Sequence, residues 1–337
     1  MKKKEPEKEG SILIIALWSI CLLSTLAVIL GFGVRQKIIL VKRLEERDKT
    51  HFLAEAAIKR AIVEIKKESE KSYHALNQDW SNNSPAFSGI AVGNGKFDVS
   101  YEIIGGQDKT APSTGYGMID EESKININKA DPVTLIRLFH LAGLEDAAAQ
   151  DLAFSVIDWR DSDSELSVPT GSAENSYYRN LAYPYEAKDG DFEVLEELFL
   201  GKGVSGGVFQ KIKNYITIYG SGKVNINTAG EAVLLALGLS RDTAEKIVSY
   251  RNGKDALAAT ADDNIFRHPF ELVERLSQFY RLSDLELAEL ESISEKAVVK
   301  SEHFFARGSA KLNNAKFESQ LNCVINSVGQ VLYCTES

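Results

Sequence analysis

From Ser11 to Gly33 the chain reads SILIIALWSICLLSTLAVILGFG, a stretch without a charged residue. As an α-helix this stretch is long enough to cross about 30 Å of hydrocarbon, so it predicts a transmembrane helix. A secretory signal peptide fits less well, because its apolar core would be shorter and a small-residue cleavage site would follow it. A helix buried in the core of a soluble protein is the alternative that stays open.

The helical pattern continues beyond the apolar stretch. As far as Ile65 the apolar residues fall largely on one stripe of a helix, with Lys, Arg and Glu on its other sides. We expect one helix that ends at about Lys67, in which residues 34–68 continue the transmembrane segment 11–33 toward a globular head. At 1.5 Å per residue this rod would be on the order of 85 Å long.

Composition limits what the head can do. The 337-residue chain is 44% hydrophobic, which is enough to bury a sizeable core. Its formal net charge of -9 argues against a polyphosphate partner, because such a partner requires a basic surface. The sequence has no nucleophile elbow and no Walker motif, and Gly201, Gly203 and Gly206 follow a predicted helix instead of a strand. We therefore expect a protein that is not an enzyme.

Two sets of strand patterns alternate apolar and polar residues, the first at 96–104 and 116–127, the second at 297–307, 310–325 and 328–333. Each set is too small to be stable alone. We therefore expect residues 73–128 and 297–337 to form one antiparallel sheet that packs on the long helix. Residues 129–296 are then a large insertion, and its pattern is mainly helical.

Three motifs of this central region occur twice in the same order: KININKA at 124–130 and KVNINTA at 223–229, IDWR at Ile157–Arg160 and VSYR at Val248–Arg251, FEVLEEL at Phe192–Leu198 and FELVERL at Phe270–Leu276. The region therefore contains two repeat units, at about 124–218 and 223–295. Both units resemble SAM-like or helix-hairpin-helix modules.

Some helix-hairpin-helix modules hold DNA phosphates with the backbone amides of a Gly-x-Gly hairpin. In the second unit the hairpin reads Gly238, Leu239, Ser240, so the second glycine is missing, and the surrounding chain is acidic. We expect this hairpin to pack against protein. A membrane-anchored DNA-binding protein for DNA uptake is the alternative function.

The first unit carries a loop rich in carboxylates, thirteen residues longer than its counterpart in the second unit: Asp158, Asp161, Asp163, Glu165 and Glu174. Hard oxygens that alternate with small serines can converge on a calcium ion at about 2.3–2.6 Å. The spacing is not that of an EF-hand, because the central glycine and the terminal glutamate are not at the required positions. A calcium site and a solvated acidic loop both stay open.

Cys323 and Cys334 lie in the expected C-terminal hairpin, where a disulfide explains two thiols best. Disulfides persist outside the reducing cytosol, so this pair would place the head outside it. Basic residues flank both ends of the apolar stretch, and charge counting alone does not settle the orientation. Two unpaired thiols remain the alternative.

The N-terminus resembles a type IV prepilin signal. A short charged leader, residues 1–10, ends in Gly10, and the apolar helix begins directly at Ser11, which resembles the site that prepilin peptidase cleaves after the glycine. Most members of these families have Glu at the fifth mature position, where this chain has Ile15. The member that lacks this glutamate is the minor pseudopilin called protein K of the type II secretion system. The INxNTA lead and the FExxEEL helix of the insertion also resemble protein K.

This resemblance implies the fold class and the location. It implies an α+β fold, with a pilin-like long N-terminal helix on a small antiparallel sheet and a large, mainly helical insertion. The protein would cross the bacterial inner membrane once, with its head in the periplasm. It would initiate or cap the periplasmic pseudopilus that drives protein export across the outer membrane.

The resemblance also implies partners and site residues. Expected partners are the other minor and major pseudopilins, the inner-membrane assembly platform and prepilin peptidase, with the secreted substrate as a further candidate and no nucleic acid. In pilin-like families the buried glutamate neutralises the N-terminal amine of a neighbouring subunit, so Ile15 suits the tip of the filament. Calcium is implied as the cofactor, and Asp161, Asp163 and Glu174 match the acidic positions of the family most closely.

Overall fold

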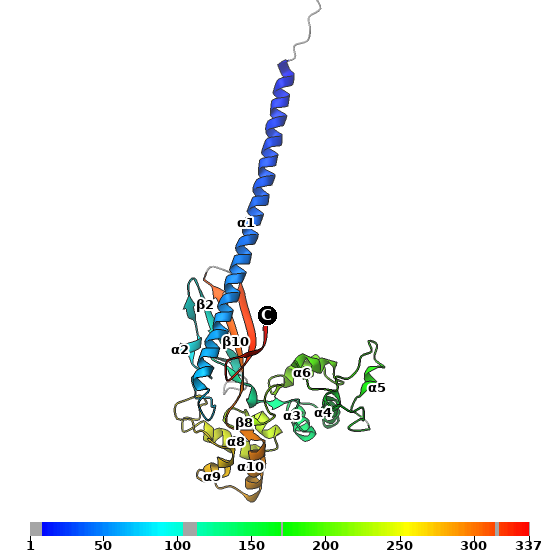
Figure 1. Cartoon of the computed structure of the whole chain (residues 1–337), viewed down its shortest axis with the longest axis vertical. Helices are drawn as coiled ribbons and strands as arrows, with labels where there is room; N and C mark the ends of the chain where they lie inside the picture. Colours follow the sequence, from blue (N-terminus) through cyan, green and yellow to red (C-terminus); the bar gives the residue numbers. More distant parts are fainter. Residues whose placement is uncertain (1–8, 104–112, 170, 314–316, 337) are drawn as a thin grey trace, which may run out of the picture.

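The computed structural model describes residues 9–103, 113–169, 171–313 and 317–336. The molecule is a long helix, α1 (Glu9–Glu68), that rises from an elongated head (Figure 1). The second half of α1 packs on an antiparallel sheet, and the helical insertion lies at the end of the head away from the N-terminus of α1. The expected α+β fold, with its long helix, small sheet and helical insertion, is confirmed.

The two halves of α1 have different surroundings. All residues from 12 to 41 are exposed, whereas Thr50 is fully buried and begins the half that packs on the head. Here the helix presents Ala54 and Ala57 to Gly308 of the sheet, and both alanines are fully buried. A Cβ on Gly308 would lie 2.8 Å from the Ala57 Cβ and 2.9 Å from the Ala54 carbonyl oxygen. Small residues on both sides therefore let the helix and the sheet approach closely.

In the described part of the chain, α1 is the one helix long and apolar enough to cross a membrane. The most apolar stretch of α1 is not buried inside the protein at all. The alternative of a helix buried in a soluble core is therefore wrong. We treat α1 as a candidate membrane anchor.

The main sheet has the strand order β1-β2-β10-β11-β12, with β5 also paired to β10, and all these pairs are antiparallel. The strands are β1 (Ile90–Val92), β2 (Gly95–Val99), β5 (Ile119–Asp120), β10 (His303–Leu312), β11 (Glu318–Asn326) and β12 (Val331–Glu336). Phe97 lies opposite Ala310, so strands from both sides of the insertion pair as predicted. Buried and partly exposed residues alternate along β10, which gives the sheet an apolar face toward α1.

Several strands are shorter than their sequence pattern. The pattern at 116–127 predicts one strand, but the 3-10 turn η1 (Glu121–Ser123) separates β5 from β6 (Ile125–Asn126). The strand breaks because the Asp120 carboxylate accepts the Glu122 N–H at 2.8 Å and starts the turn. A side chain that caps a turn competes here with the strand ladder.

The pattern at 297–307 also divides, into β9 (Ala297–Val298) and β10. Between them the Ser301 N–H donates to the His74 imidazole at 2.9 Å instead of joining the sheet. Residues 310–325 contain the turn between β10 and β11, and residues 314–316 of that turn lie outside the described residues.

The predicted strand at 96–104 divides as well. Its second part, β3 (Tyr101–Ile103), pairs with β4 (Ser113–Gly115) in a separate hairpin. The segment before β2 contains a short helix, α2 (Ser84–Phe87), in addition to β1.

The insertion consists of two units that each begin and end with a short strand. The first unit contains β6, α3 (Pro132–Leu141), α4 (Asp146–Arg160), α5 (Asn175–Tyr178), η2 (Leu195–Leu200), α6 (Gly206–Ile212) and β7 (Ile216–Thr217). The second contains β8 (Val224–Asn225), α7 (Glu231–Ala236), α8 (Arg241–Arg251), η3 (Pro269–Glu271), α9 (Leu272–Ser277), α10 (Asp284–Lys296) and β9. In each unit the first strand pairs in parallel with the last.

An asparagine fixes the same phenylalanine in each unit. The Asn128 side chain accepts the Phe192 N–H at 2.8 Å and donates to the Phe192 carbonyl at 3.0 Å. Asn227 makes the same two bonds to Phe266, both at 2.9 Å. The sequence match of Phe192 with Phe270 is therefore wrong by four residues. Phe270 is 68% exposed, whereas Phe192 and Phe266 are buried, and a match of letters could not see this difference.

An arginine repeats in the same way. Arg160 donates to two carbonyls of the turn after β6, and Arg251 donates to the two equivalent carbonyls after β8. Between Arg160 and Phe192 there are 31 residues, and between Arg251 and Phe266 there are 14. The loop of the first unit is thus seventeen residues longer, not thirteen.

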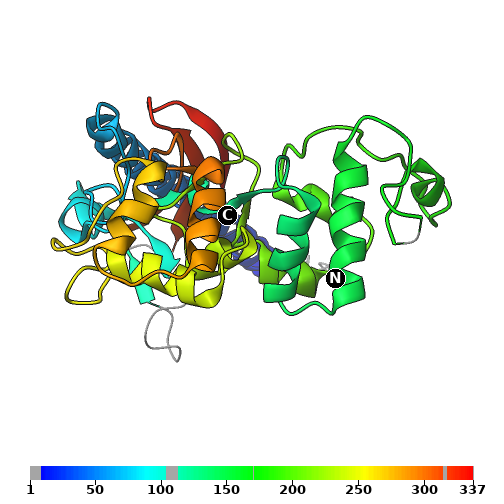
Figure 2. The same ribbon diagram turned by 90° about the horizontal axis from the view of Figure 1, so that it is seen from below.

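The two units are attached to the head differently (Figure 2). The Asn225 amide of the second unit donates to the His74 carbonyl at 3.1 Å, to Asp120 at 2.9 Å and to Ser301 at 2.8 Å, and all four residues are buried. The equivalent Asn126 donates to two carbonyls of the link between the units. The second unit is therefore fastened to the sheet, and the first unit extends to the side, where α3 packs on α7.

Candidate cation site in the first unit

Three carboxylates of the first unit converge. One oxygen from each of Asp161, Asp163 and Glu174 lies within 4.8 Å of the others. Asp161 is the C-cap of α4 and Glu174 is the N-cap of α5, so two helix ends hold the outer members of the group. The loop that the sequence singled out therefore brings three of its five acids together.

The other two predicted acids lie differently. Asp158, in the last turn of α4, is fully buried, and its Oδ1 accepts the Ser167 N–H at 3.1 Å. Glu165 has an exposed side chain and contributes its backbone N–H to Asp163 Oδ1 at 2.8 Å. Its carboxylate is not part of the converging group.

Three oxygens of the site are buried without a hydrogen-bond partner: Asp158 Oδ2, Asp161 Oδ1 and Glu174 Oε1. A buried polar atom without a partner costs free energy, and an ionised one costs more. A cation among these oxygens would remove that cost. A set made only of carboxylate oxygens suits a hard cation such as calcium, so the residues present fit the expected ion.

The electrostatics of the site point the same way. Burial raises the pKa of Asp161 to about 6, and the negative charges of Asp163 and Asp158 add to the shift. Burial also raises the pKa of Glu174 to about 7, although the Asn175 N–H opposes the shift. The site therefore holds more negative charge than its surroundings neutralise.

Asp189 was not among the predicted acids, and its charge raises the pKa of both Asp161 and Glu174. Its backbone is left-handed, with φ of 51°, a conformation that Asp tolerates better than most residues. The Asp-Gly pair formed with Gly190 was the available signal, because this dipeptide marks turns.

A lysine supports the loop before Glu174. The Lys202 amine donates to the carbonyls of Gly171 at 2.7 Å and Ser172 at 3.2 Å, and it lies 5.2 Å from the centre of the Tyr177 ring. Beneath the loop, the Trp159 ring meets the Tyr178 ring edge to face at 5.2 Å. The loop that carries the three carboxylates is thus flanked by aromatic side chains from α4 and α5 that pack together.

The corresponding loop of the second unit satisfies its own carboxylates. Asp262 Oδ2 accepts the N–H groups of Lys254 at 2.7 Å and Asp255 at 3.2 Å, and Asp263 Oδ2 accepts that of Ala259 at 2.9 Å. Hydrogen bonds from the Thr260 hydroxyl and from the N–H groups of Lys254 and Asp255 lower the pKa of Asp262 to about 2. No oxygen of Asp262 or Asp263 is buried without a hydrogen-bond partner.

The hairpin of the second unit also contains its own anion. Ser240 caps α8, and the hydroxyls of Ser240 and Thr243 both donate to the Glu289 carboxylate of α10, the first at 2.9 Å. A carboxylate thus lies beside the helix end where a DNA phosphate would have to approach. Like charges repel, so this arrangement disfavours nucleic acid.

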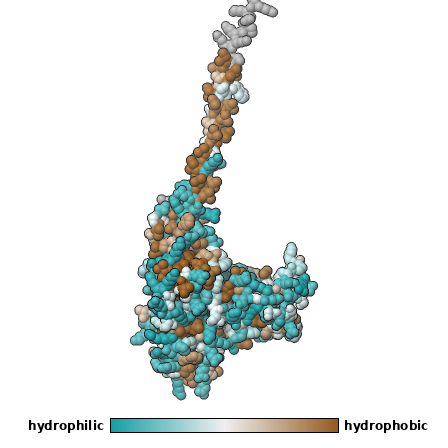
Figure 3. All heavy atoms as spheres, in the orientation of Figure 1, coloured by the Kyte–Doolittle hydropathy of each residue, from teal (hydrophilic) through white to brown (hydrophobic). Residues whose placement is uncertain are grey.

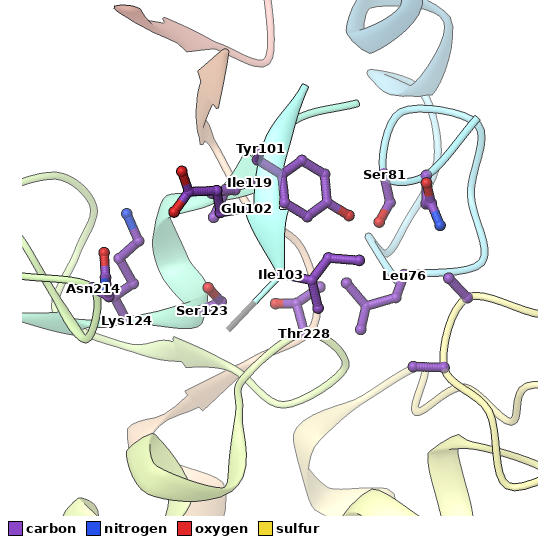
Figure 4. A pocket seen from close by; sticks show the side chains of 13 residues that line it. Leu76, Ser81, Tyr101, Glu102, Ile103, Ile119, Ser123, Lys124, Asn214 and Thr228 are labelled. Atoms are coloured by element: carbon purple, nitrogen blue, oxygen red, sulfur yellow. The ribbon is translucent and has the colours of Figure 1, made fainter. Parts of the chain in front are cut away.

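A cavity of about 320 Å³ lies where the sheet and both units meet (Figure 4). Tyr101, Glu102 and Ile103 of β3 line its middle, with Lys124 and Asn214 to the left and Ser81 to the right in Figure 4. Glu102 is the only carboxylate among its described lining residues. No set of charged groups converges there, and we assign no ligand to it.

The expected processing and assembly positions lie on α1. The backbone of Gly10 and Ser11 is helical, since α1 begins at Glu9, two residues earlier than Ser11, where the sequence predicts its start. Residues 1–8 of the leader lie outside the described residues. Ile15 is 63% exposed on the apolar half of the helix, where it is available to a neighbour or to lipid.

A disulfide joins Cys323 and Cys334, which lie opposite each other on β11 and β12. It ties the outermost strand of the sheet to its neighbour. The third cysteine, Cys21, is exposed on α1.

Comparison with known proteins shows what this region is similar to. Residues 118–221 match the family model described as type II secretion system (T2SS), protein K. The matched region contains the first repeat unit, including the three converging carboxylates.

Two similar proteins extend the match. The type II secretion system protein K of Aeromonas hydrophila is 33% identical over 119 residues, which are 33% of this chain and 36% of that protein. The match thus spans about a third of that relative's length. A solved chain from the GspK-GspI-GspJ complex of the enterotoxigenic Escherichia coli type 2 secretion system covers 88% of this chain, with a TM-score of 0.67 and 17% identity. It shows the same fold around the matched region. These comparisons do not support the alternative of a DNA-binding protein for uptake.

Proposed function

We propose that the chain is a minor pseudopilin of the type II secretion system. It initiates or caps the periplasmic pseudopilus that drives protein export across the outer membrane. The observation that carries this proposal is a region similar to protein K, inserted into a head whose sheet packs on a half-exposed apolar helix. That combination suits a subunit held by its helix among other helices, with no catalytic role.

The location follows from α1 and the disulfide. The exposed apolar half of α1 anchors the chain in the inner membrane by a single pass. The Cys323–Cys334 disulfide favours a head in the periplasm, since disulfides form and persist there.

Two features favour the tip of the filament. The insertion adds its bulk at the end of the head that is far from the membrane helix, where a stacked subunit would need room (Figure 1). Ile15 offers no carboxylate to pair with the N-terminal amine of a further subunit. The other minor pseudopilins are the first partners to expect, because the similar solved chain belongs to a complex of three such proteins. Major pseudopilins, the assembly platform, prepilin peptidase and the secreted substrate are the remaining expected partners.

A complementation experiment tests the function. In a type II-secreting bacterium without its protein K, the full chain should restore export and co-purify with the other minor pseudopilins. The variant Gly10→Leu should keep the leader and lose both properties. Gly31→Leu is the matched control, because a Cβ on Gly31 meets no atom within 4 Å. Unchanged electrophoretic mobility of Gly10→Leu relative to the parent, in cells with active prepilin peptidase, would count against processing at this site.

We further propose that calcium is the ion of the cation site, held by Asp161, Asp163 and Glu174 with Asp158 close by. Calcium would supply the positive charge that the buried oxygens lack. Calorimetric titration of the chelator-treated protein should show calcium binding that Asp161→Asn with Asp163→Asn abolishes. Glu165→Gln is the matched control, since its carboxylate is outside the group. Equal binding by all three proteins would refute the site.

A further inference from the structure

Between the membrane-spanning part of α1 and the head lies a short segment with only positive charges. Arg35, Lys37, Lys42 and Arg43 fall within nine residues, and the sequence has no Asp or Glu between Glu9 and Glu45. All four side chains are exposed. Lys42 lies 3.6 Å from Glu46 and remains 74% exposed, and the other three have no ion-pair partner among the described residues. We call these four residues the collar.

The collar surrounds the helix. At about 100° per residue, and taking Arg35 as zero, Lys37 points to about 200°, Lys42 to about 340° and Arg43 to about 80°. A partner protein that packs on one side of α1 could meet only part of this set. A flat layer of lipid headgroups around the helix meets all of it.

The length of α1 places the collar at such a layer. Residues 12–34 span roughly 35 Å as a helix, enough to cross the hydrocarbon core of about 30 Å. The next nine residues, about 13 Å of helix, lie in the headgroup region and just beyond it. The first fully buried residue of the head, Thr50, follows roughly 10 Å later, so no described part of the head covers the collar.

The residues between the charges are also suited to an interface. Ile38 and Leu40 are 63% and 58% exposed, and the apolar residues 38–41 lie between Lys37 and Lys42. Long basic side chains can keep their carbon stems near the acyl chains while the charged ends reach the phosphates. The opposite face of the bilayer is 23 residues of helix away, so the collar belongs to the leaflet next to the head.

We propose that the collar binds the phosphates of anionic phospholipids in the leaflet next to the head. It thereby sets the depth of α1 in the membrane and holds the head close to the surface. The space-filling view shows where this occurs, as polar residues that interrupt the apolar helix before it enters the head (Figure 3). The proposal requires only that α1 spans a bilayer and is independent of the secretion function.

Lipid selectivity tests the proposal directly. The full chain is reconstituted alone in phosphatidylcholine liposomes with a trace of spin-labelled phosphatidylglycerol or phosphatidylcholine, and electron paramagnetic resonance measures the bound fraction of each. The chain should prefer phosphatidylglycerol by roughly threefold or more at low salt. At 1 M salt the preference should fall toward one, because the Debye length shortens to about 3 Å.

Variants identify the residues. Lys2, Lys3, Lys4 and Lys8 precede the other end of the apolar stretch and can also attract anionic lipid. Replacing the four collar residues by Gln should therefore remove the part of the preference that these lysines do not provide, while Arg35→Lys with Arg43→Lys should keep all of it. The matched control removes four exposed lysines of the head region instead, Lys59, Lys66, Lys96 and Lys311, and should keep the preference. The proposal is overturned if the parent chain shows no preference, if the collar variant retains the full preference of the parent, or if the control loses as much as the collar variant.

Discussion

The two repeat units share one frame and differ in what it carries. In both, an asparagine fixes a buried phenylalanine, and an arginine bonds to two carbonyls of the leading turn. The loop between that arginine and that phenylalanine has unsatisfied carboxylate oxygens in the first unit, whereas backbone amides satisfy those of the second. The shared hydrogen bonds therefore stabilise the fold of both units, whereas the ability to bind a cation depends on the loop.

The largest expected effect tests the shared frame. Arg251 is buried, whereas Arg160 makes the same kind of bonds in a partly exposed position. Arg251→Ala should cost about 3 kcal/mol or more, because it leaves two buried carbonyls without a donor. Arg160→Ala should cost less, since water can reach its site. Thermal melting of the full chain in detergent measures both, and equal losses would show that burial does not separate the units.

The next effect tests the difference between the loops. Calcium at about one hundred times its dissociation constant should stabilise the protein by about 2.7 kcal/mol, and a chelator should remove this gain. Asp161→Asn with Asp163→Asn should abolish the calcium-induced rise in Tm. The equivalent change in the second unit, Asp262→Asn with Asp263→Asn, should leave the rise intact. If both pairs of substitutions reduced it equally, the two loops would not differ in the way the structure indicates.

A smaller effect tests the attachment of the second unit to the sheet. Burial, followed by the charge of Glu122, raises the pKa of Asp120 to about 7, well above the usual value of about 4 for an unfolded Asp. A raised carboxyl pKa favours the protonated folded form, so this group's contribution to stability falls as pH rises from about 4 to about 7. Relative to Asp120→Asn, the parent chain should therefore be less stable at pH 8 than at pH 5. Melting of both proteins with chelator present measures this, and parallel pH curves would contradict it.

The smallest effect concerns the hairpin of each unit. Glu289→Gln should cost about 0.5–1 kcal/mol, because the carboxylate loses charge-assisted bonds from Ser240 and Thr243 near the start of α8. In the first unit Glu145 occupies the N-cap position of α4, as Ser240 does in α8. The Glu145 side chain makes no capping hydrogen bond. Glu145→Gln should therefore change stability by only a few tenths of a kcal/mol. Chemical denaturation measures the free energy of unfolding of both variants. A larger loss of stability for Glu145→Gln than for Glu289→Gln would contradict this prediction.

The register of the repeat shows where sequence reasoning failed. Phe and Leu each recur four residues apart in the second unit, at 266 and 270 and at 272 and 276, so a match of letters aligned Phe192 with Phe270 in place of Phe266. The difference lies in burial and in two backbone bonds to Asn227. No local pattern records such bonds, because their partners are 39 residues apart.

The candidate site was found only in part for a similar reason. Asp161, Asp163 and Glu174 stood out because acids cluster in a surplus loop, and the structure brings them together. Glu165 has the same composition signal but an exposed side chain. Asp189 was marked only by its Asp-Gly pair, and its charge acts on Asp161 from the far end of the loop.

By itself the sequence determined the long helix, its apolar half, the insertion between two parts of one sheet and the presence of a repeat. These features depend on hydrophobic period and on local propensity, which are written in consecutive residues. Only the tertiary structure decided which phenylalanine anchors the second unit, which acids converge and how Asp120 and Asn225 fasten that unit to the sheet. Those outcomes depend on burial and on hydrogen bonds between segments far apart in the sequence, such as His74 and Asn225, 151 residues apart, which exist only after the chain has folded.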